Sequence, residues 1–177
     1  MHIVAKFNNM EENDILLFLY EASQAKVNVQ LIVRGFCCLR PQVKGVSENI
    51  TVQSTLGRFL EHSRVFYFRN GKVDPIDGDF YIGSADWMYR NLHARVEALC
   101  PIYDRLAKEK LWAILQLYLN DVKQSWTMKT DAGYDRKASV KGLSKEVAAV
   151  GVQNELMKLA SFHHAMTEDD LIKEVKE

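Results

Sequence analysis

The sequence predicts an α/β fold in which helices flank both faces of a mixed β-sheet. The chain opens with a strand, a helix and a second strand, an order that produces parallel strands joined by a right-handed crossover. Further along, two short apolar segments separated by Asn70-Gly71 and Asp74-Pro75 are typical of an antiparallel hairpin. A long amphipathic segment at 104–122 then supplies a further helix.

The first half of the chain predicts the parallel part of the sheet. Apolar residues, Phe18 among them, recur with helical spacing after the first strand, and Asn9 or Asn13 is the expected N-cap of that helix. A β-branched run follows and predicts the second strand. The expected elements, in order, are a strand at 3–6, a helix at 10–25, strands at 29–33 and 50–54, and a loop at 36–49 between these two strands.

The second half predicts the antiparallel part of the sheet and two more helices. Asp104 is the expected cap of the long helix, whose apolar face includes Leu106, and Ser144 is the expected cap of the last helix. Residues 130–141 are polar and rich in turn residues. The expected elements are a short helical turn at 58–61, strands at 64–68, 80–83, 95–102 and 125–129, and helices at 104–122 and 144–159.

Size and composition indicate one soluble globular domain. The 177 residues are 47% hydrophobic and 26% charged, which is ordinary for such a domain and sufficient for a sizeable core. We expect the domain to span 1–165 and a loosely docked charged tail to span 166–177. No apolar run is long enough to cross a membrane, and the start of the chain lacks the pattern of a signal peptide.

Charge and cysteine content narrow the partners and the compartment. The formal net charge is zero, so a polyanion has to be bound by a local cluster of cations and not by the field of the whole molecule. The three cysteines are Cys37, Cys38 and Cys100, and their odd number and spacing match neither a disulfide framework nor a metal site. This pattern favours buried thiols in a reducing compartment, which for this chain predicts the cytoplasm.

The most informative motif combines His62 and Arg64 with Gly83-Ser84 downstream. Two side chains separated by one residue lie on the same side of an extended strand, so the imidazole and the guanidinium are expected together. Gly83-Ser84 ends another predicted strand, where small residues let backbone N–H groups approach an anion closely. A histidine, a guanidinium, a hydroxyl and free amides at strand ends predict a site for a phosphoryl group. The alternative for His62 is a core histidine bound to a backbone carbonyl.

Other cations are candidates for the same site. Arg34 follows a predicted strand, and ligands of open α/β sheets bind at the carboxyl ends of strands, where a guanidinium can hold two phosphate oxygens. The alternative for Arg34 is a surface salt bridge. Arg58, Arg64, Arg90 and Lys6 are weaker candidates for the wall of an anion channel, with a solvated or structural cation as the equal alternative.

Several ordered runs resemble the C-terminal part of bacterial polyphosphate kinase. They are Leu31 to Pro41 (LIVRGFCCLRP), Ser47 to Ile50 (SENI), Gly57 to Arg64 (GRFLEHSR), Gly83 to Met88 (GSADWM) and Arg90 to Leu92 (RNL). The resemblance implies a phospholipase D-like fold, in which two similar α/β domains face each other and each brings a histidine, a basic residue and a Gly-Ser segment to a shared phosphoryl site. This sequence matches the second of those domains. The family's phosphorylated histidine belongs to the first domain.

The resemblance assigns a role to each candidate residue. His62 is implied to assist as acid or base without being the phosphorylated nucleophile. Arg34, Arg58, Arg64 and Ser84 are implied to bind ATP or phosphate together with His62. Asp86 is implied to hold His62 or an arginine, because it stands where related phosphodiesterases carry asparagine and a carboxylate repels phosphate unless it is paired. Glu61 is likewise implied to orient a neighbour. Two further groups favour structural roles: Trp87, Tyr67 and Tyr81 in core packing instead of base stacking, and His163 and His164 on a solvated helix end instead of a metal site.

The implied activity is reversible transfer of the terminal phosphoryl group of ATP to polyphosphate, through a phosphohistidine in a domain absent from this chain. Mg²⁺ is expected with ATP, bound mainly by the absent domains, and the isolated chain is expected to be inactive. The implied partners are ATP or ADP, polyphosphate and the remaining kinase domains. The full enzyme is expected to be a homo-oligomer that can associate with a membrane surface, and no nucleic acid is expected as a ligand. Two alternatives stay open: a homodimeric phosphodiesterase or nuclease, disfavoured by Arg64 and Asp86, and a non-catalytic polyphosphate-binding module.

Overall fold

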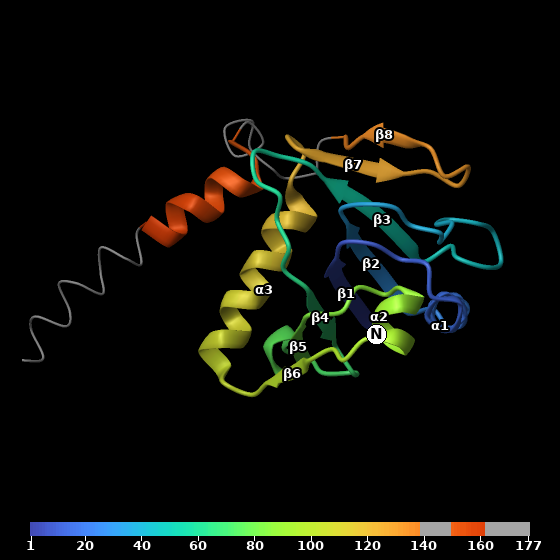
Figure 1. Cartoon of the computed structure of the whole chain (residues 1–177), viewed down its shortest axis with the longest axis horizontal. Helices are drawn as coiled ribbons and strands as arrows, with labels where there is room; N and C mark the ends of the chain where they lie inside the picture. The colour runs from blue at the N-terminus through green and yellow to red at the C-terminus, as the bar shows by residue number, and fades with distance from the viewer. Residues whose placement is uncertain (139–149, 162–177) are drawn as a thin grey trace, which may run out of the picture.

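An eight-stranded mixed sheet organises the computed structural model, which describes residues 1–138 and 150–161 (Figure 1). The strand order across the sheet is β6-β5-β4-β1-β2-β3-β7-β8. Three central strands, β1 to β3, are parallel, and every other neighbouring pair is antiparallel. The strands are β1 (His2–Phe7), β2 (Asn28–Val33), β3 (Ile50–Thr55), β4 (Val65–Phe68), β5 (Asp79–Gly83), β6 (Leu99–Ile102), β7 (Ser125–Met128) and β8 (Tyr134–Arg136).

Helices cover both faces of this sheet, as the sequence predicted. In Figure 1, α3 lies on one side of the sheet, and α1 and α2 lie on the other. Asp104 caps α3 by accepting a hydrogen bond from the Ala107 N–H at 2.8 Å, which confirms the expected cap. The helices are α1 (Asn13–Gln24), the 3₁₀ turn η1 (Pro75–Asp77), α2 (Tyr89–Ala94), α3 (Arg105–Asn120) and a last helix over 152–161.

Side-chain alternation along the strands divides the core into two layers. On the α1 face, Ala5 and Phe7 of β1 pack in a buried apolar cluster with Leu19 of α1. On the α3 face, Val4 of β1 packs with Leu115 of α3. Because neighbouring residues of a strand point to opposite faces, both layers are anchored on the same central strands.

The strand register brings distant segments to one edge of the sheet. Parallel strands end at a common edge, so the residues after β1 and β2 lie there together. Lys6 pairs with Val65 at the start of β4, which places Arg64 beside the end of β1. Val65 in turn pairs with Ile82, so the Gly83-Ser84 segment follows β5 at the same edge.

Several expectations about individual elements were wrong. The first helix begins at Asn13 after Glu12, with no side-chain cap from Asn9 or Asn13. Residues 58–61 form bends and coil instead of a helical turn. The strand expected at 95–102 is shorter than predicted and corresponds to β6 alone, because α2 and a loop precede it. β8 lies within the segment expected to be turns. Phe18 and Leu106, expected on apolar faces, are 65% and 67% exposed.

Cysteine burial also differs from the expectation. Cys37 is half-buried, but Cys38 and Cys100 are exposed, and all three thiols are free. Burial raises the pKa of the Cys37 thiol to about 11, so this thiol is protonated at neutral pH. The exposure of Cys38 and Cys100 contradicts the prediction of three buried thiols.

Some expected features lie outside the described residues. They are the Ser144 cap, the first part of the helix at 144–159, the tail at 166–177, and His163 and His164. Within 1–138 and 150–161, no helix combines the length and apolarity needed to cross a bilayer.

Candidate functional site

Asp86, Arg64 and His62 form a connected chain of contacts at the carboxyl edge of the parallel strands. The Arg64 guanidinium donates to both Asp86 carboxylate oxygens, with Nε to Oδ1 at 3.1 Å and Nη2 to Oδ2 at 3.2 Å. Its third nitrogen, Nη1, lies 2.8 Å from the His62 carbonyl oxygen and 3.2 Å from the His62 Nδ1. Asp86 is 5% exposed, whereas His62 is exposed. The contacts therefore lead from a buried carboxylate to an imidazole at the surface.

Asn8 completes the environment of Asp86. The Asn8 backbone N–H donates to Asp86 Oδ1 at 2.7 Å, and its side-chain amide donates to the same oxygen at 3.1 Å. The carboxylate thus has a guanidinium and two N–H partners, which replace the hydrogen bonds that it would make to solvent. This geometry agrees with the interpretation that Asp86 holds an arginine and does not face a bound phosphate.

The contact between Arg64 and His62 selects one form of the neutral imidazole. A guanidinium donates hydrogen bonds and accepts none, so Nδ1 of His62 has to accept. A neutral imidazole that accepts at Nδ1 carries its proton on Nε2. Nε2 is therefore the nitrogen left to donate a hydrogen bond to a ligand at the sheet edge.

We expect ¹⁵N NMR of the folded chain to find neutral His62 mainly as the Nε2–H tautomer. Replacing Arg64 by lysine keeps a cation for Asp86 but removes the second arm of the guanidinium, so the tautomer preference should weaken. His93, which lies 3.3 Å from Glu12 and does not contact Arg64, is the internal control and should not change in Arg64→Lys. A mainly Nδ1–H tautomer in the unmodified chain would contradict this assignment.

Lys6 and Glu61 form a second ion pair below the segment that carries His62. Lys6 is 3% exposed; its ammonium pairs with the Glu61 carboxylate and donates to the Ser63 carbonyl oxygen at 3.2 Å. The other Glu61 oxygen accepts from the Ser63 N–H at 2.7 Å. The Lys6 ammonium also lies 4.8 Å from the centroid of the Tyr118 ring, within the range of a cation–π contact.

This second pair gives Lys6 a role different from the one expected. Burial lowers the pKa of Lys6, and the pairing with Glu61 offsets part of that effect. Burial acting alone would raise the pKa of Glu61, but hydrogen bonds from Lys6 and Ser63 bring it below its ordinary value. Since the ammonium is enclosed and paired, Lys6 does not line an open channel. It fixes the shape of the 61–64 segment.

Arg34 has hydrogen-bonding capacity left over. It follows β2 and is half-buried, and its Nη1 is buried with no hydrogen-bond partner in the described part of the chain. Arg34 lines a small cavity of about 10 Å³ together with Lys6 and Glu61. A buried N–H without an acceptor is costly, and one water or one ligand oxygen would satisfy it.

The remaining predicted residues lie around this edge and differ in how many contacts they make within the chain. The Ser84 hydroxyl donates to Glu97 and accepts from the Ala98 N–H at 3.0 Å, so both its donor and one acceptor position are occupied within the chain. Arg58 is exposed over the Phe59 ring, and Arg90 is exposed on α2. The structure brings Arg34, Glu61, Arg64 and Asp86 together with Lys6, and leaves Arg58 and Arg90 at the surface.

Sequence reasoning missed Asn8 and Glu97. Asn8 directly follows β1, so its position at the end of a parallel strand was a usable signal. Glu97 accepts hydrogen bonds from Ser84 and from the Asn91 side chain, and these bonds lower its pKa. No pattern in the sequence connects Glu97 with Ser84, because the contact depends on how the chain returns after α2.

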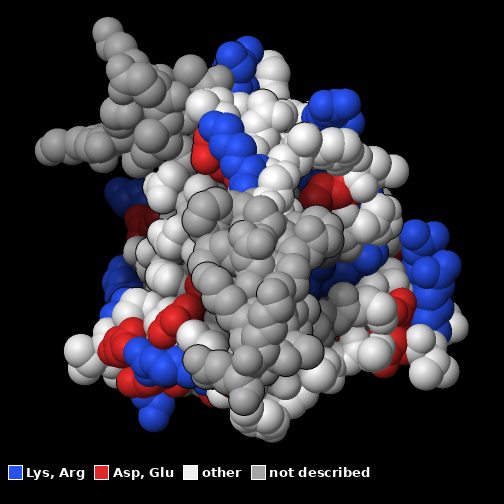
Figure 2. Space-filling model, turned by 90° about the vertical axis from the view of Figure 1, so that its left-hand side faces the viewer, with Lys and Arg blue, Asp and Glu red and all other residues white. Residues whose placement is uncertain are grey.

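On one face of the molecule the charges are mixed. Figure 2 shows the side of the molecule that lies on the left in Figure 1, and basic and acidic side chains are interspersed over its described part. With a net charge of zero, binding of a polyanion depends on the local cations at the sheet edge.

The described residues do not fit a resident metal ion. No group of three or more His, Cys, Asp or Glu side chains within residues 1–138 and 150–161 has the arrangement of a metal site. The two carboxylates at the sheet edge, Asp86 and Glu61, are each paired with a cation.

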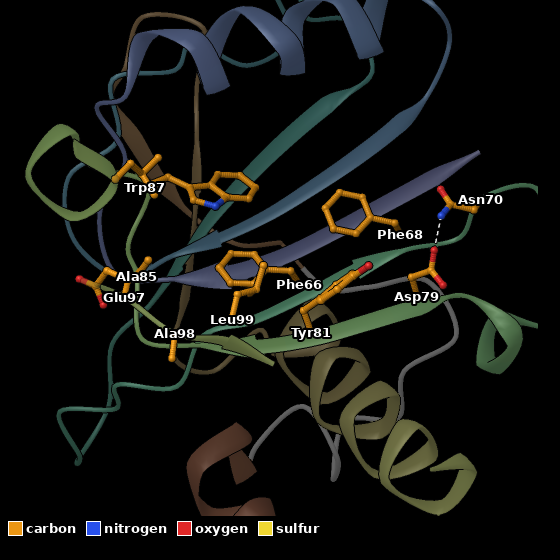
Figure 3. A pocket seen from close by; sticks show the side chains of 11 residues that line it. Phe66, Phe68, Asn70, Asp79, Tyr81, Ala85, Trp87, Glu97, Ala98 and Leu99 are labelled. Atoms are coloured by element: carbon orange, nitrogen blue, oxygen red, sulfur yellow. Dashed lines mark hydrogen bonds between the residues drawn. The ribbon is translucent and has the colours of Figure 1, made fainter. Parts of the chain in front are cut away.

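An aromatic cavity lies beside this site, on the α1 face of the sheet. It has a volume of about 620 Å³, and Phe66, Phe68 and Tyr81 form its floor while Trp87 closes one end (Figure 3). Trp87 stacks on Phe66 with ring centroids 5.3 Å apart. Tyr67 has no exposed surface and packs against Phe80, as expected for a core residue. The charged residues that line the cavity, Asp79 and Glu97, are acidic, which disfavours a phosphate ligand there.

The family model and the sequence relatives described here are all polyphosphate kinases. Residues 1–149 match the family model described as polyphosphate kinase C-terminal domain 2. A polyphosphate kinase of Synechocystis sp. is 53% identical over 132 residues, which cover 75% of this chain and 18% of that protein. A polyphosphate kinase of Pseudomonas aeruginosa is 47% identical over 135 residues, 76% of this chain and 19% of that protein. The chain thus spans less than a fifth of the length of these relatives.

Solved structures agree on the fold. The crystal structure of polyphosphate kinase from Porphyromonas gingivalis superimposes with a TM-score of 0.77 and 31% identity, over 90% of this chain and 24% of that chain. Nuc from Salmonella typhimurium, a phospholipase D family member, superimposes with a TM-score of 0.54 at 14% identity, over 73% of this chain and 82% of that chain, and shows the fold alone. The fold is therefore phospholipase D-like, and the chain belongs to the polyphosphate kinase C-terminal domain 2 family.

Proposed function

We propose that this domain supplies half of a phosphoryl-transfer site, in which ATP and polyphosphate exchange a terminal phosphoryl group. The proposal is supported most directly by the Asp86–Arg64–His62 chain of contacts at the carboxyl edge of the parallel strands. That edge is where open α/β sheets bind ligands. Family membership is consistent with these substrates, since the relatives are named polyphosphate kinases.

Each residue has a part in the proposed site. The Nε2–H of His62 donates a hydrogen bond to a phosphoryl oxygen, and Arg64 holds the imidazole in position from behind. Arg34 adds a cation, and its enclosed Nη1 reaches a second oxygen through the one water that the small cavity can hold. Such fixed donors stabilise the charge that develops on the transferred group. The phosphorylated histidine lies in another domain of the longer enzyme, so the domain described here positions and stabilises without being the nucleophile.

Magnesium has no assigned ligand among these residues. Because Asp86 and Glu61 are ion-paired, we derive no step through a metal bound to this domain. That Mg²⁺ accompanies ATP and is held mainly by other domains stays a prediction. The cytoplasmic location and the homo-oligomer of the full enzyme are predictions of the same kind.

A binding experiment on the 177-residue chain tests the proposal. We expect weak binding of polyphosphate, measured by calorimetry, and about a tenfold loss of affinity in Arg34→Ala, the cost of one charge-assisted hydrogen bond. Arg105→Ala is the matched control, because Arg105 is exposed and pairs with Asp74 and Asp77 at the opposite end of the sheet. Unchanged affinity in Arg34→Ala would reject the clamp. Efficient formation of phosphohistidine from ATP on this chain alone would reject its assignment as the assisting half.

The same material tests the homodimeric phosphodiesterase. In that case the chain would form a dimer by light scattering and cleave a generic phosphodiester such as bis(p-nitrophenyl) phosphate, and His62→Ala would abolish cleavage. We expect no cleavage, because each copy of a complete symmetric site would have to present Arg64 to the substrate, and Arg64 is already paired with Asp86. Binding of polyphosphate that survives His62→Ala but not Arg34→Ala would favour a non-catalytic module.

A further inference from the structure

Lys137 lies apart from the phosphoryl site and has an unusual set of partners. It follows β8, and its ammonium nitrogen lies 2.7 Å from Gln53 Oε1 and in contact with the Leu119 carbonyl oxygen near the end of α3. Both acceptors are neutral. Within the residues that the structure describes, no carboxylate pairs with Lys137, although Lys6, Lys129 and Lys158 each have one.

Neither acceptor carries a charge that would offset the cost of burying a Lys137 ammonium. An ammonium has three N–H donors; two contact Gln53 and Leu119, and the third is left for solvent, because Lys137 is only half-buried. An uncharged amine has two N–H donors and one lone pair. With both donors bound to Gln53 and Leu119, the lone pair is left for a reaction.

A cavity of about 340 Å³ lies against the Lys137 side chain, between α3 and the neighbouring strands. Its polar lining is uncharged apart from Lys137 and consists of Gln30, Thr51, Gln53, Gln116, Asn120 and Thr127. Asp121, after the end of α3, is the charged group that acts on Lys137. Burial lowers the pKa of Lys137 to about 8, against the opposing effect of Asp121, so about a tenth of the side chain is uncharged at pH 7.

We propose that Lys137 is a nucleophilic amine that accepts an acyl group from small acyl phosphates. The lone pair attacks the acyl carbon, a C–N bond forms, and the bond from that carbon to the phosphate oxygen breaks. Phosphate leaves with the electron pair and takes the proton released by nitrogen, so the products are an amide and hydrogen phosphate. The amide and hydroxyl donors of the cavity suit the phosphate oxygens, and no carboxylate lines it to repel them.

Acylation would change the end of α3. The amide nitrogen keeps one N–H, so either Gln53 or the Leu119 carbonyl loses its partner. The positive charge beside the helix C-terminus also disappears, and cations at that end stabilise helices. This modification site is independent of the proposed phosphoryl transfer and would exist whether or not that proposal holds.

The test uses the full 177-residue chain with acetyl phosphate, and mass spectrometry to measure the acetylation rate of each lysine over the range of about pH 7 to 10. We expect the rate of Lys137 to level off above about pH 9, one unit above its pKa of about 8, because nearly all of the amine is then deprotonated. The rate of Lys129, an exposed and ion-paired lysine in the same chain, should continue to rise. A Lys137 profile that follows that of Lys129, or no acetylation of Lys137, would overturn the proposal.

Gln53→Glu is the matched variant, because it keeps Lys137 and places a carboxylate beside its nitrogen. The ion pair should move the plateau of the rate to higher pH, while Lys129 is unaffected. An unchanged Lys137 profile in a folded Gln53→Glu chain would count against the proposal. A second measurement needs no substitution: NMR titration of the Lys137 side chain should give a midpoint near 8, and a midpoint near the ordinary 10.5 would overturn it.

Discussion

Replacing Asp86 by alanine is expected to lower the free energy of unfolding by about 3 kcal/mol, because it leaves a partly buried guanidinium without its counter-ion. Arg64 would lose two hydrogen bonds, and the Asn8 N–H would lose its acceptor inside the protein. The His62 imidazole would lose its fixed neighbour as well. We therefore expect the chemical denaturation midpoint and polyphosphate affinity to fall together in Asp86→Ala.

Two further variants isolate the cause. Asp86→Asn keeps an oxygen for the Asn8 N–H but removes the charge, so its loss of stability should lie between those of the unmodified chain and Asp86→Ala. Asp77→Ala removes a carboxylate from an exposed pair with Arg105 and should cost less than about 1 kcal/mol. A similar cost for Asp86→Ala and Asp77→Ala would mean that the buried pair is not structurally important.

Replacing Lys6 by methionine is expected to cost about 2 kcal/mol of unfolding free energy, less than a fully buried pair because the Glu61 side chain is 27% exposed. Methionine fills a similar volume, so the main loss is the ammonium that pairs with Glu61 and binds the Ser63 carbonyl oxygen. The 61–64 segment should become more mobile, and hydrogen exchange of the Ser63 N–H should accelerate.

The double variant Lys6→Met with Glu61→Gln supplies the control. If the cost arises from an unpaired carboxylate, the double variant should be more stable than the sum of the two single changes predicts. Acid provides a second check. The pKa of Glu61 lies below its ordinary value, so its stabilising contribution is present above the unfolded-state pKa and is lost as pH falls through the folded-state pKa. The stability difference between the unmodified chain and Lys6→Met should therefore narrow from about pH 5 to pH 3, and a constant difference would contradict the pairing.

Much of the site was accessible from the sequence, because topology decides which strand ends meet. The order of strands and the hairpin placed Arg34, Arg64 and Ser84 at one edge, and the structure has them there. Electrostatics predicted that Asp86 pairs with His62 or an arginine, since an unpaired carboxylate cannot share a site with phosphate, and the structure has the arginine. The identity of that arginine required the register between β4 and β5, which local patterns do not determine.

The failures have physical causes of the same kind. Phe18 and Leu106 have helical spacing with other apolar residues, but each helix buries only a narrow stripe against the sheet, so residues at the margin stay exposed. The helical turn expected at 58–61 is replaced by an irregular path, because the Phe59 backbone bonds to Gln153 and Glu61 turns inward to Lys6. Contacts between residues so distant in sequence override local propensity.

The two ion pairs at the sheet edge have a consequence for how a repetitive ligand would be held. Asp86 neutralises Arg64, and Glu61 neutralises Lys6. Of these three cations at the sheet edge, Arg34 is therefore the one whose charge no described carboxylate cancels. All repeat units of such a polymer carry the same charge. When one uncompensated cation holds the polymer, its binding free energy is nearly the same whichever unit contacts that cation. The polymer can advance by one phosphate while exchanging a single contact. An edge at which all three cations were free would bind such a polymer more tightly and resist that sliding.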